Sequence, residues 1–207
     1  MSLMTMWGYE LTNADALPDL LSAADFNTLT ANRFSGDVRI PQELKAASMA
    51  IRNYIGWHLY PAEECRLKMN MQNRRIVFVG SDILIQLPAK FVTDVDSVVI
   101  GEKECSFSFE TNGILRVYDV DCRGLKRYSE ITIIYTAGLP DEYMGAINEL
   151  VAHRLTHALT SSNGVTSETA GGVSITYNSG WVNSSRATAL PSDNKEVLAP
   201  YRCQGVF

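Results

Sequence analysis

Three side chains spaced four residues apart, Glu149, His153 and His157, are the best candidates for catalysis in this chain. In a helix this spacing places them on one face, where two imidazoles can ligate a metal ion. The metalloprotease pattern is H-E-x-x-H, in which a glutamate follows the first histidine and acts as general base. Arg154 occupies that position here, so the base is missing. A metal-dependent hydrolase that uses His153 and His157 is therefore only an alternative hypothesis.

Other patterns of catalytic residues are absent from the sequence. It contains no G-x-S-x-G elbow and neither of the glycine-rich nucleotide-binding motifs. The cysteines Cys65, Cys105, Cys122 and Cys203 lie far apart and form no C-x-x-C pair. This spacing argues against a zinc knuckle or a redox dithiol and favours reduced thiols. We expect no enzymatic activity, no catalytic residues, no metal ligands and no cofactor.

Composition narrows the possible classes of protein. The chain has 207 residues, 46% of them hydrophobic, which is enough to bury a core. Its formal charge of −5 argues against a protein that binds nucleic acid by neutralising phosphates. The opening residues lack the basic start and apolar core of a signal peptide, and no apolar run reaches the ~18 residues of a membrane span. We expect a soluble protein that is not exported.

Two helices are predicted within residues 17–60. Ser22 has the type and position of an N-cap for a short first helix. Pro41 suits the first turn of a second helix, which runs to about Gly56 and carries apolar residues at spacings of three and four. This amphipathic pattern predicts that one face of the second helix packs on a core.

The segment 139–160 is predicted to be the main packing helix. A strand pattern at residues 131–135 stops at Gly138, and Pro140 presets the backbone for a first helical turn. The helix from Asp141 to about Thr160 then carries a broad apolar face. We expect this helix to be the rigid element of the fold.

Residues 61–138 are predicted to be a β-rich insertion. Short apolar runs alternate with turn residues, and the gaps are too short for parallel crossovers, so antiparallel pairing is expected. The predicted strands are, in order, 75–79, 83–87, 95–100, 105–109, 114–120 and 131–135. An Asn112-Gly113 turn marks the hairpin between the fourth and fifth of them.

Residues 161–207 are predicted to be a loop, a strand and a C-terminal arm. The polar, glycine-containing residues 161–172 indicate an exposed loop, residues 173–177 alternate as in a strand, and a short helix is expected at 194–199. The whole chain, 1–207, is therefore expected to be one α+β domain. Its N-terminal helices and a long C-terminal packing helix would enclose a central antiparallel β insertion.

Five segments follow one another in a characteristic order. They are the helices that end in Ile55-Gly56, ILIQLPAKFVTDVDSVVIG at 83–101, ITIIYTAGLPDEYMGAINELVAHR at 131–154, SETAGGVSITY at 167–177, and VLAPYR at 197–202. In this order they resemble the head-tail connector, or adaptor, proteins of tailed bacteriophages and prophages. The resemblance covers most of the chain from about Leu17 onward, although the β region at 74–135 is longer than in the smallest members of that family.

The resemblance implies a structural virion protein that acts by assembly. Connector subunits form a ring with other copies, twelve-fold in the virion, under the portal protein at the neck. The ring joins the DNA-filled head to the tail and contacts tail or head-completion proteins. DNA passes through its channel during packaging and release without specific binding, and no membrane takes part. The location implied is the virion neck, and the bacterial host cytoplasm during assembly.

Partner contacts are expected toward the C-terminus. The resemblance implies that Leu198, Tyr201, Arg202 and Phe207 dock on a neighbouring subunit or on the portal, and Tyr and Arg are enriched at contact hot spots. Trp181 lies in a polar, loop-like segment, where an aromatic residue indicates a partner contact. A tail-completion or tail-terminator protein is a second alternative, which also acts by assembly.

Overall fold

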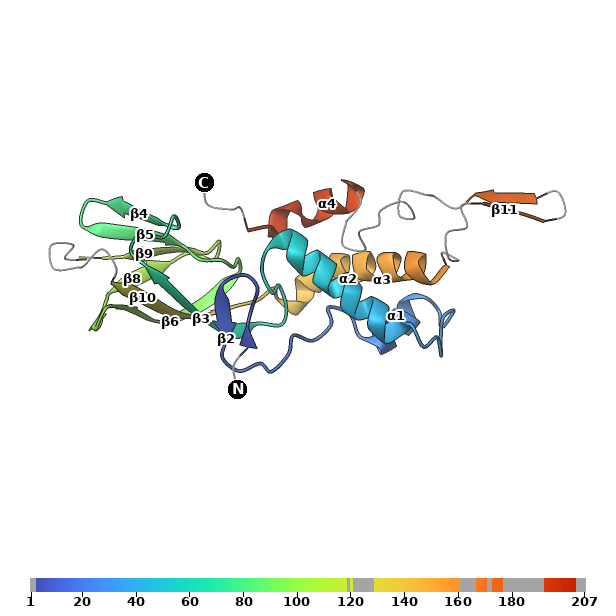
Figure 1. The fold of residues 1–207 in the computed structure, drawn as a ribbon, viewed down its shortest axis with the longest axis horizontal. Coiled ribbons are helices and arrows are strands. Elements are labelled where there is room, and N and C mark those ends of the chain that lie inside the picture. Colours follow the sequence, from blue (N-terminus) through green and yellow to red (C-terminus); the bar gives the residue numbers. More distant parts are fainter. Residues whose placement is uncertain are drawn as a thin grey trace. The chain divides into compact units, whose positions relative to one another are not determined.

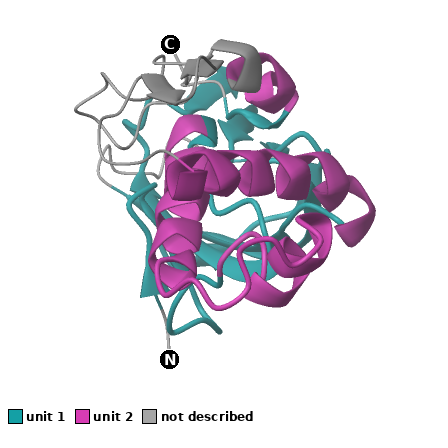
Figure 2. Cartoon of the chain, turned by 90° about the vertical axis from the view of Figure 1, so that its right-hand side faces the viewer, with its two compact units in different colours: residues 1–18, 55–140, 201–207 teal, residues 19–54, 141–200 magenta. Residues whose placement is uncertain are grey.

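The computed structural model describes residues 3–118, 120, 129–160, 167–170, 173–176 and 192–203. The chain divides into two compact units (Figure 2). The first, which we call the sheet unit, comprises Met1–Pro18, Ile55–Pro140 and Tyr201–Phe207. The second, the helical unit, comprises Asp19–Tyr54 and Asp141–Pro200.

Antiparallel sheet predominates in the part of the chain that the structure describes. It contains ten strands in two sheets, a separate two-stranded hairpin, and four α-helices of seven, 16, 17 and seven residues. The expected α+β class, with a long C-terminal packing helix and a central β insertion, is therefore wrong. N-terminal residues for which the sequence predicted no element join the sheet, and the first turn of the expected packing helix is a 3-10 turn.

The larger sheet of the sheet unit has six antiparallel strands (Figure 1). In spatial order they are β1 (Leu3–Met4), β2 (Tyr9–Leu11), β3 (Glu63–Asn70), β10 (Glu130–Ala137), β6 (Val92–Ile100) and β7 (Lys103–Glu104). β10 lies in the middle, between β3 and β6. Its residues Ile131, Ile133 and Tyr135 are fully buried on one face, so the strand predicted from their alternation is confirmed as a core strand.

The smaller sheet has four antiparallel strands, in the order β4 (Ile76–Val79), β5 (Asp82–Gln86), β9 (Ile114–Val117) and β8 (Phe107–Phe109). Both predicted hairpins, β4–β5 and β8–β9, are confirmed. Gly113 closes the second turn with a φ of +87°, and a Cβ atom there would collide with the Ala89 carbonyl. Only glycine suits this position, which explains the Asn-Gly signal in the sequence.

The two sheets of the sheet unit share a corner. The Cys105 N–H donates to the Val98 carbonyl (2.9 Å), and the Val92 N–H donates to the Thr111 carbonyl (3.1 Å). These bonds tie the residues on either side of β8 to β6, so the two sheets remain joined along β6. Each sheet turns buried aliphatic residues inward, including Ile83, Ile85, Leu115 and Val117 of the smaller sheet.

The helical unit contains the remaining elements. They are α1 (Ala23–Leu29), α2 (Ile40–Ile55), the 3-10 turn η1 (Asp141–Tyr143), α3 (Met144–Thr160), the hairpin β11 (Ser167–Ala170) and β12 (Val173–Thr176), α4 (Ser192–Leu198) and η2 (Ala199–Tyr201). The last residues of α2 and η2 belong to the sheet unit. Ser22 caps α1 as predicted, because its Oγ accepts from the Asp25 N–H (3.0 Å).

The side chain of Arg39, just before α2, links the start of that helix to the last turn of α3. Arg39 pairs with Asp37 (2.7 Å) and also donates to the Leu159 carbonyl (3.2 Å) in the last turn of α3. A cation at the C-terminal end of a helix satisfies exposed carbonyls and is favoured by the helix dipole. The pKa of Asp37 is lowered chiefly by its hydrogen bond from Arg39.

The C-terminal prediction requires one further correction. Part of the loop expected at 161–172 is strand β11, which pairs with β12 over Ser167↔Thr176 to Ala170↔Val173. Residues 161–166 and 171–172 lie outside the described residues. Among the helices that the structure does describe, none combines the length and the apolar character needed to cross a membrane.

Candidate functional site: the C-terminal anchor

The histidine pair that the sequence singled out lies on α3. His153 is exposed and His157 is half-buried, and Glu149 is exposed on the same helix. Within the described ranges, no group of three or more His, Cys, Asp or Glu side chains is arranged to hold a metal ion. The described residues thus bring no further ligands to His153 and His157.

A different set of residues, far apart in sequence, meets in the sheet unit. It comprises the segment 55–59, which begins at the last residue of α2, Phe91 before β6, the segment 138–139 after β10, and the segment 201–203, which begins at the last residue of η2. We call this set the C-terminal anchor, because it holds the last described residues of the chain.

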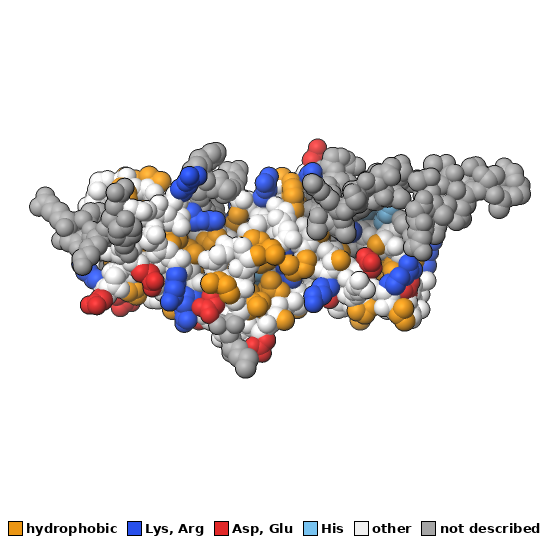
Figure 3. All heavy atoms as spheres, in the orientation of Figure 1, with side chains coloured by type: hydrophobic (Ala, Val, Ile, Leu, Met, Phe, Trp, Pro, Cys, Tyr) orange, Lys and Arg blue, Asp and Glu red, His pale blue; other side chains and the backbone are white. Residues whose placement is uncertain are grey.

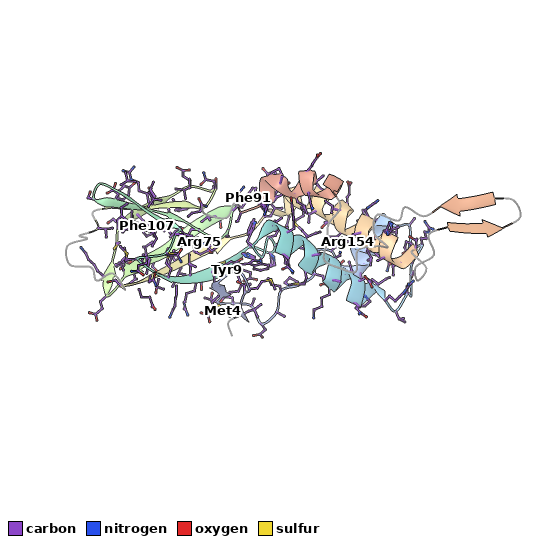
Figure 4. The ribbon with its side chains drawn as sticks, turned by 45° about the horizontal axis from the view of Figure 1, so that its top comes forward. Met4, Tyr9, Arg75, Phe91, Phe107 and Arg154 are labelled. Carbon is purple, nitrogen blue, oxygen red and sulfur yellow. The ribbon has the colours of Figure 1, made fainter. Side chains whose placement is uncertain are left out.

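Three kinds of contact hold the C-terminal segment in the anchor. The indole Nε1–H of Trp57, which is fully buried, donates to the Tyr201 carbonyl (2.8 Å). The Tyr201 ring stacks on Phe91 with centroids 6.2 Å apart and an interplanar angle of 29° (Phe91 is labelled in Figure 4). The Cys203 N–H donates to the Ile55 carbonyl (2.9 Å). A buried indole that donates one hydrogen bond suits a structural anchor, because its N–H must find an acceptor.

Unusual backbone conformations position the anchor. Gly56 ends α2 with a φ of +84°, which glycine adopts easily. Leu59 and Phe91 also have positive φ values, +68° and +54°, which are strained for residues with bulky side chains. Their carbonyls accept from the segment after β10: the Leu139 N–H donates to Leu59 (2.7 Å), and the Gly138 N–H donates to Phe91 (3.2 Å). These bonds hold both strained residues in place.

Gly138 is required where β10 leaves the sheet. A Cβ atom at this position would overlap the main-chain N (2.5 Å) and Cα of Ala62. The sequence pattern predicted that a strand ends at this glycine. The glycine also allows the backbone at residue 138 to approach the backbone of Ala62 closely.

Two buried polar side chains, Tyr9 and His58, hydrogen-bond to each other and link β2 to the anchor. Tyr9 of β2 (labelled in Figure 4) and His58 are both buried, and the Tyr9 hydroxyl lies 2.8 Å from His58 Nδ1 and 2.9 Å from the His58 main-chain N–H. His58 Nε2 lies 2.9 Å from the Ala137 carbonyl, which can only accept. In the neutral ring Nε2 therefore carries the hydrogen, and Nδ1 accepts from the Tyr9 hydroxyl.

Burial favours the protonated forms of the Cys65 and Cys203 thiols and of the Tyr135 hydroxyl. Burial is the largest cause of the raised pKa values of Cys65, about 12, and Cys203, about 11. Burial likewise raises the pKa of Tyr135 well above 10. Since the thiolate is the nucleophile, these raised pKa values disfavour the reactive form of both cysteines at neutral pH.

The predicted interface residues take different places. Leu198 is fully buried in α4, whereas Tyr201 is half-buried in the anchor and Arg202 beside it is exposed. Trp181 and Phe207 lie outside the described residues. The sequence did not identify Trp57, Phe91 or Gly138 as partners of the C-terminal segment. Only Gly138 gave a local signal, because the other two contacts depend on long-range packing.

The chain matches no protein-family model and no curated protein. Its functional assignment therefore depends on the sequence resemblance and on the geometry of the anchor.

Proposed function

We propose that this protein is a head-tail connector subunit of a tailed bacteriophage or prophage, which acts by assembly and not by catalysis. The observation that carries this proposal is that segments far apart in the sequence meet in the C-terminal anchor. Four of the five segments on which the resemblance depends contribute residues to it: Ile55, Phe91, Gly138 and Tyr201. Their common contact gives a physical reason why those segments occur together in one chain.

In the proposed role, copies of the protein form a ring under the portal at the virion neck, twelve-fold in the virion. The ring joins portal to tail or head-completion proteins after synthesis in the host cytoplasm. A net charge of −5 on every subunit supports passage of DNA through the channel without specific binding, because a negative wall repels phosphates.

The anchor has the properties that a ring subunit needs near a contact surface. A subunit that repeats around an axis must hold its interface at a fixed angle, which requires a rigid base. Trp57 and His58 form such a base because both are fully buried and hydrogen-bonded. Tyr201 and Arg202 lie at the edge of this base, half-buried and exposed. We therefore assign Arg202, with the exposed part of Tyr201, to contact with a neighbouring subunit or the portal.

Electron microscopy of the full chain mixed with the portal protein encoded in the same genome tests the proposal. We expect ring density that caps one end of the portal. Arg202→Glu should reduce capping severalfold, while Lys45→Glu, an equal charge reversal at an exposed position of α2, should leave it unchanged. A portal that stays uncapped would contradict the connector assignment, and binding to tail tubes instead would favour a tail-terminator protein.

A further inference from the structure

β4 forms one edge of the smaller sheet and exposes apolar side chains. Val77, Phe78 and Val79 are 55%, 52% and 46% exposed. Hydrophobic side chains reach the surface at the upper left of Figure 3, in the region of β4 in Figure 1. Proteins normally protect such an edge with charges or bulges, because its unpaired backbone groups accept another strand. β4 itself carries no charged residue.

The backbone groups that β4 presents outward follow from its pairing with β5. The Gln86 N–H donates to the Arg75 carbonyl (2.9 Å), so odd-numbered residues of β4 bond to β5 in the register Ile76↔Ile85 to Val79↔Asp82. The N–H and C=O of Phe78 and the C=O of Ile76 therefore point away from the sheet. The Ile76 N–H is already bonded to the Asn73 carbonyl (3.0 Å).

Both faces of β4 are apolar. Ile76 and Phe78 lie opposite Ile85 and Ile83, which are fully buried, so they belong to the core-facing side. Val77 lies opposite Leu84 on the other side. A strand added alongside β4 therefore meets apolar side chains on both of its faces, and an apolar strand matches it best.

The charges that flank β4 select the direction of the added strand. Arg74 and Arg75 precede it (Arg75 is labelled in Figure 4), and Asp82, which pairs with Arg116 (2.6 Å), follows the hairpin turn. When two copies of this strand pair antiparallel, the basic end of each lies beside the Gly80–Asp82 end of the other. A parallel pair would bring the arginines together, which is unfavourable.

We propose that β4 is a self-association edge, at which the β4 strands of two copies pair antiparallel across a two-fold axis at Val77. In this register Phe78 lies opposite Ile76 of the partner subunit, and each Phe78 N–H donates to that residue's carbonyl. In the alternative register, Phe78 lies opposite the second copy's own residue 78. Ile76 then lies opposite residue 80, a glycine, and the apolar match is lost. The two four-stranded sheets become one sheet of eight strands.

This contact is separate from ring closure in the proposed connector. A two-fold contact uses the same patch on both copies and closes at two subunits. The contact is also short, since β4 has four residues. The surface area that it buries is therefore far smaller than the roughly 800 Å² per partner of a standard interface. We therefore expect weak association, visible only at high protein concentration.

Cysteine cross-linking of the full chain tests the register. The two copies of residue 77 form a non-hydrogen-bonded pair with Cα atoms about 4.5 Å apart, which a disulfide can bridge. The two copies of residue 79 lie four residues apart along the strands, roughly 14 Å, which a disulfide cannot bridge. Under oxidation at high concentration, Val77→Cys should form a covalent dimer in most molecules, at least tenfold more than Val79→Cys or the unsubstituted chain. Equal cross-linking of the two variants, or none with Val77→Cys, would overturn the proposal.

Sedimentation velocity provides a second test that needs no cysteine. The unsubstituted chain should show a monomer–dimer equilibrium that depends on concentration. Val77→Lys places two like charges opposite each other and should abolish the dimer, whereas Val38→Lys, at a valine that is 91% exposed in the helical unit, should preserve it. A chain that stays monomeric at every concentration, or a dimer that survives Val77→Lys, contradicts a self-association edge.

Discussion

The hydroxyl of Tyr9 and the ring of His58 satisfy each other's hydrogen bonds inside the sheet unit, although 49 positions separate them in the sequence. The hydroxyl accepts from the His58 main chain and donates to Nδ1, while Nε2 donates to Ala137. Both side chains are almost completely shielded from solvent. This pair fastens the N-terminal strand β2 to the segment 55–59 of the anchor.

Tyr9→Phe should destabilise the protein by about 1–3 kcal/mol, because it leaves the His58 N–H and Nδ1 buried without the hydroxyl. Urea unfolding followed by fluorescence measures the change. Tyr118→Phe is the matched control: that hydroxyl bonds Ser108 Oγ (2.6 Å) at an exposed position, so its loss should change stability by less than about 0.5 kcal/mol. Equal effects of the two variants would show that the buried pair has no special role.

A second prediction concerns two glycines with opposite surroundings. Gly138→Ala forces a Cβ atom into the backbone of Ala62, which cannot move without disturbing β3, and should destabilise by more than about 2 kcal/mol. Gly145→Ala in α3 meets no atom within 4 Å and removes a poor helix former. It should stabilise by about 0.5–1 kcal/mol. Thermal unfolding of both variants checks the signs, and a mild effect of Gly138→Ala would contradict the close approach.

The elements that the sequence predicted correctly have local signals. Ser22 caps α1 through a residue three positions away, and the Asn112-Gly113 turn is closed within its own hairpin. The alternation of residues at 131–135 was enough to predict a strand, and one face of that strand is buried. Each of these signals lies within a few residues of the structure that it specifies, so a single sequence was enough to find it.

The errors arose where structure depends on distant residues. β1 and β2 have two and three residues, and they are strands because β1 pairs with β2 and β2 pairs with β3, more than 50 positions further along the chain. The sequence analysis predicted no element at these residues, so it described the β region as an insertion between helices. The anchor was missed for the same reason, since the Trp57 indole and the Tyr201 carbonyl are 144 positions apart. Likewise, periodicity predicted β4 but did not indicate that its apolar side chains would be exposed.

The raised thiol pKa of Cys65 predicts alkaline instability. Its pKa rises from 9.0 to about 12 on folding, so its contribution to stability is complete below pH 9 and is lost as pH rises toward 12. Each such group lowers the unfolding free energy by up to about 1.4 kcal/mol per pH unit in that window. Tyr135 acts in the same direction from pH 10 upward.

Urea unfolding at several pH values measures this slope. Cys65→Ala should flatten the decline above pH 9, since the thiol that must stay protonated is gone. Cys105→Ala is the control, because Cys105 is half-exposed, and its removal should change the slope much less. The same alkaline slope in the protein with and without the Cys65 thiol would exclude this residue as the cause.

The Trp57 hydrogen bond to Tyr201 predicts a local change that the Cys203 thiol can report. Trp57→Phe removes the Nε1 donor and should loosen the segment 201–203. Release exposes Cys203 and returns its pKa from about 11 toward 9.0, which raises the thiolate fraction by up to ~100-fold. Alkylation of Cys203 near neutral pH, followed by mass spectrometry, should therefore accelerate at least tenfold.

Two controls separate local release from general unfolding. Cys65 in the same Trp57→Phe sample should stay protected, because it is fully buried on β3, which is paired with β10 on one side and β2 on the other. Trp7→Phe should leave Cys203 unchanged, since Trp7 stacks on Tyr9 of β2 (6.2 Å), whereas Trp57 bonds the C-terminal segment itself. If Cys65 and Cys203 become reactive together, the indole supports the whole sheet unit; if neither does, the hydrogen bond does not hold the C-terminal segment in place.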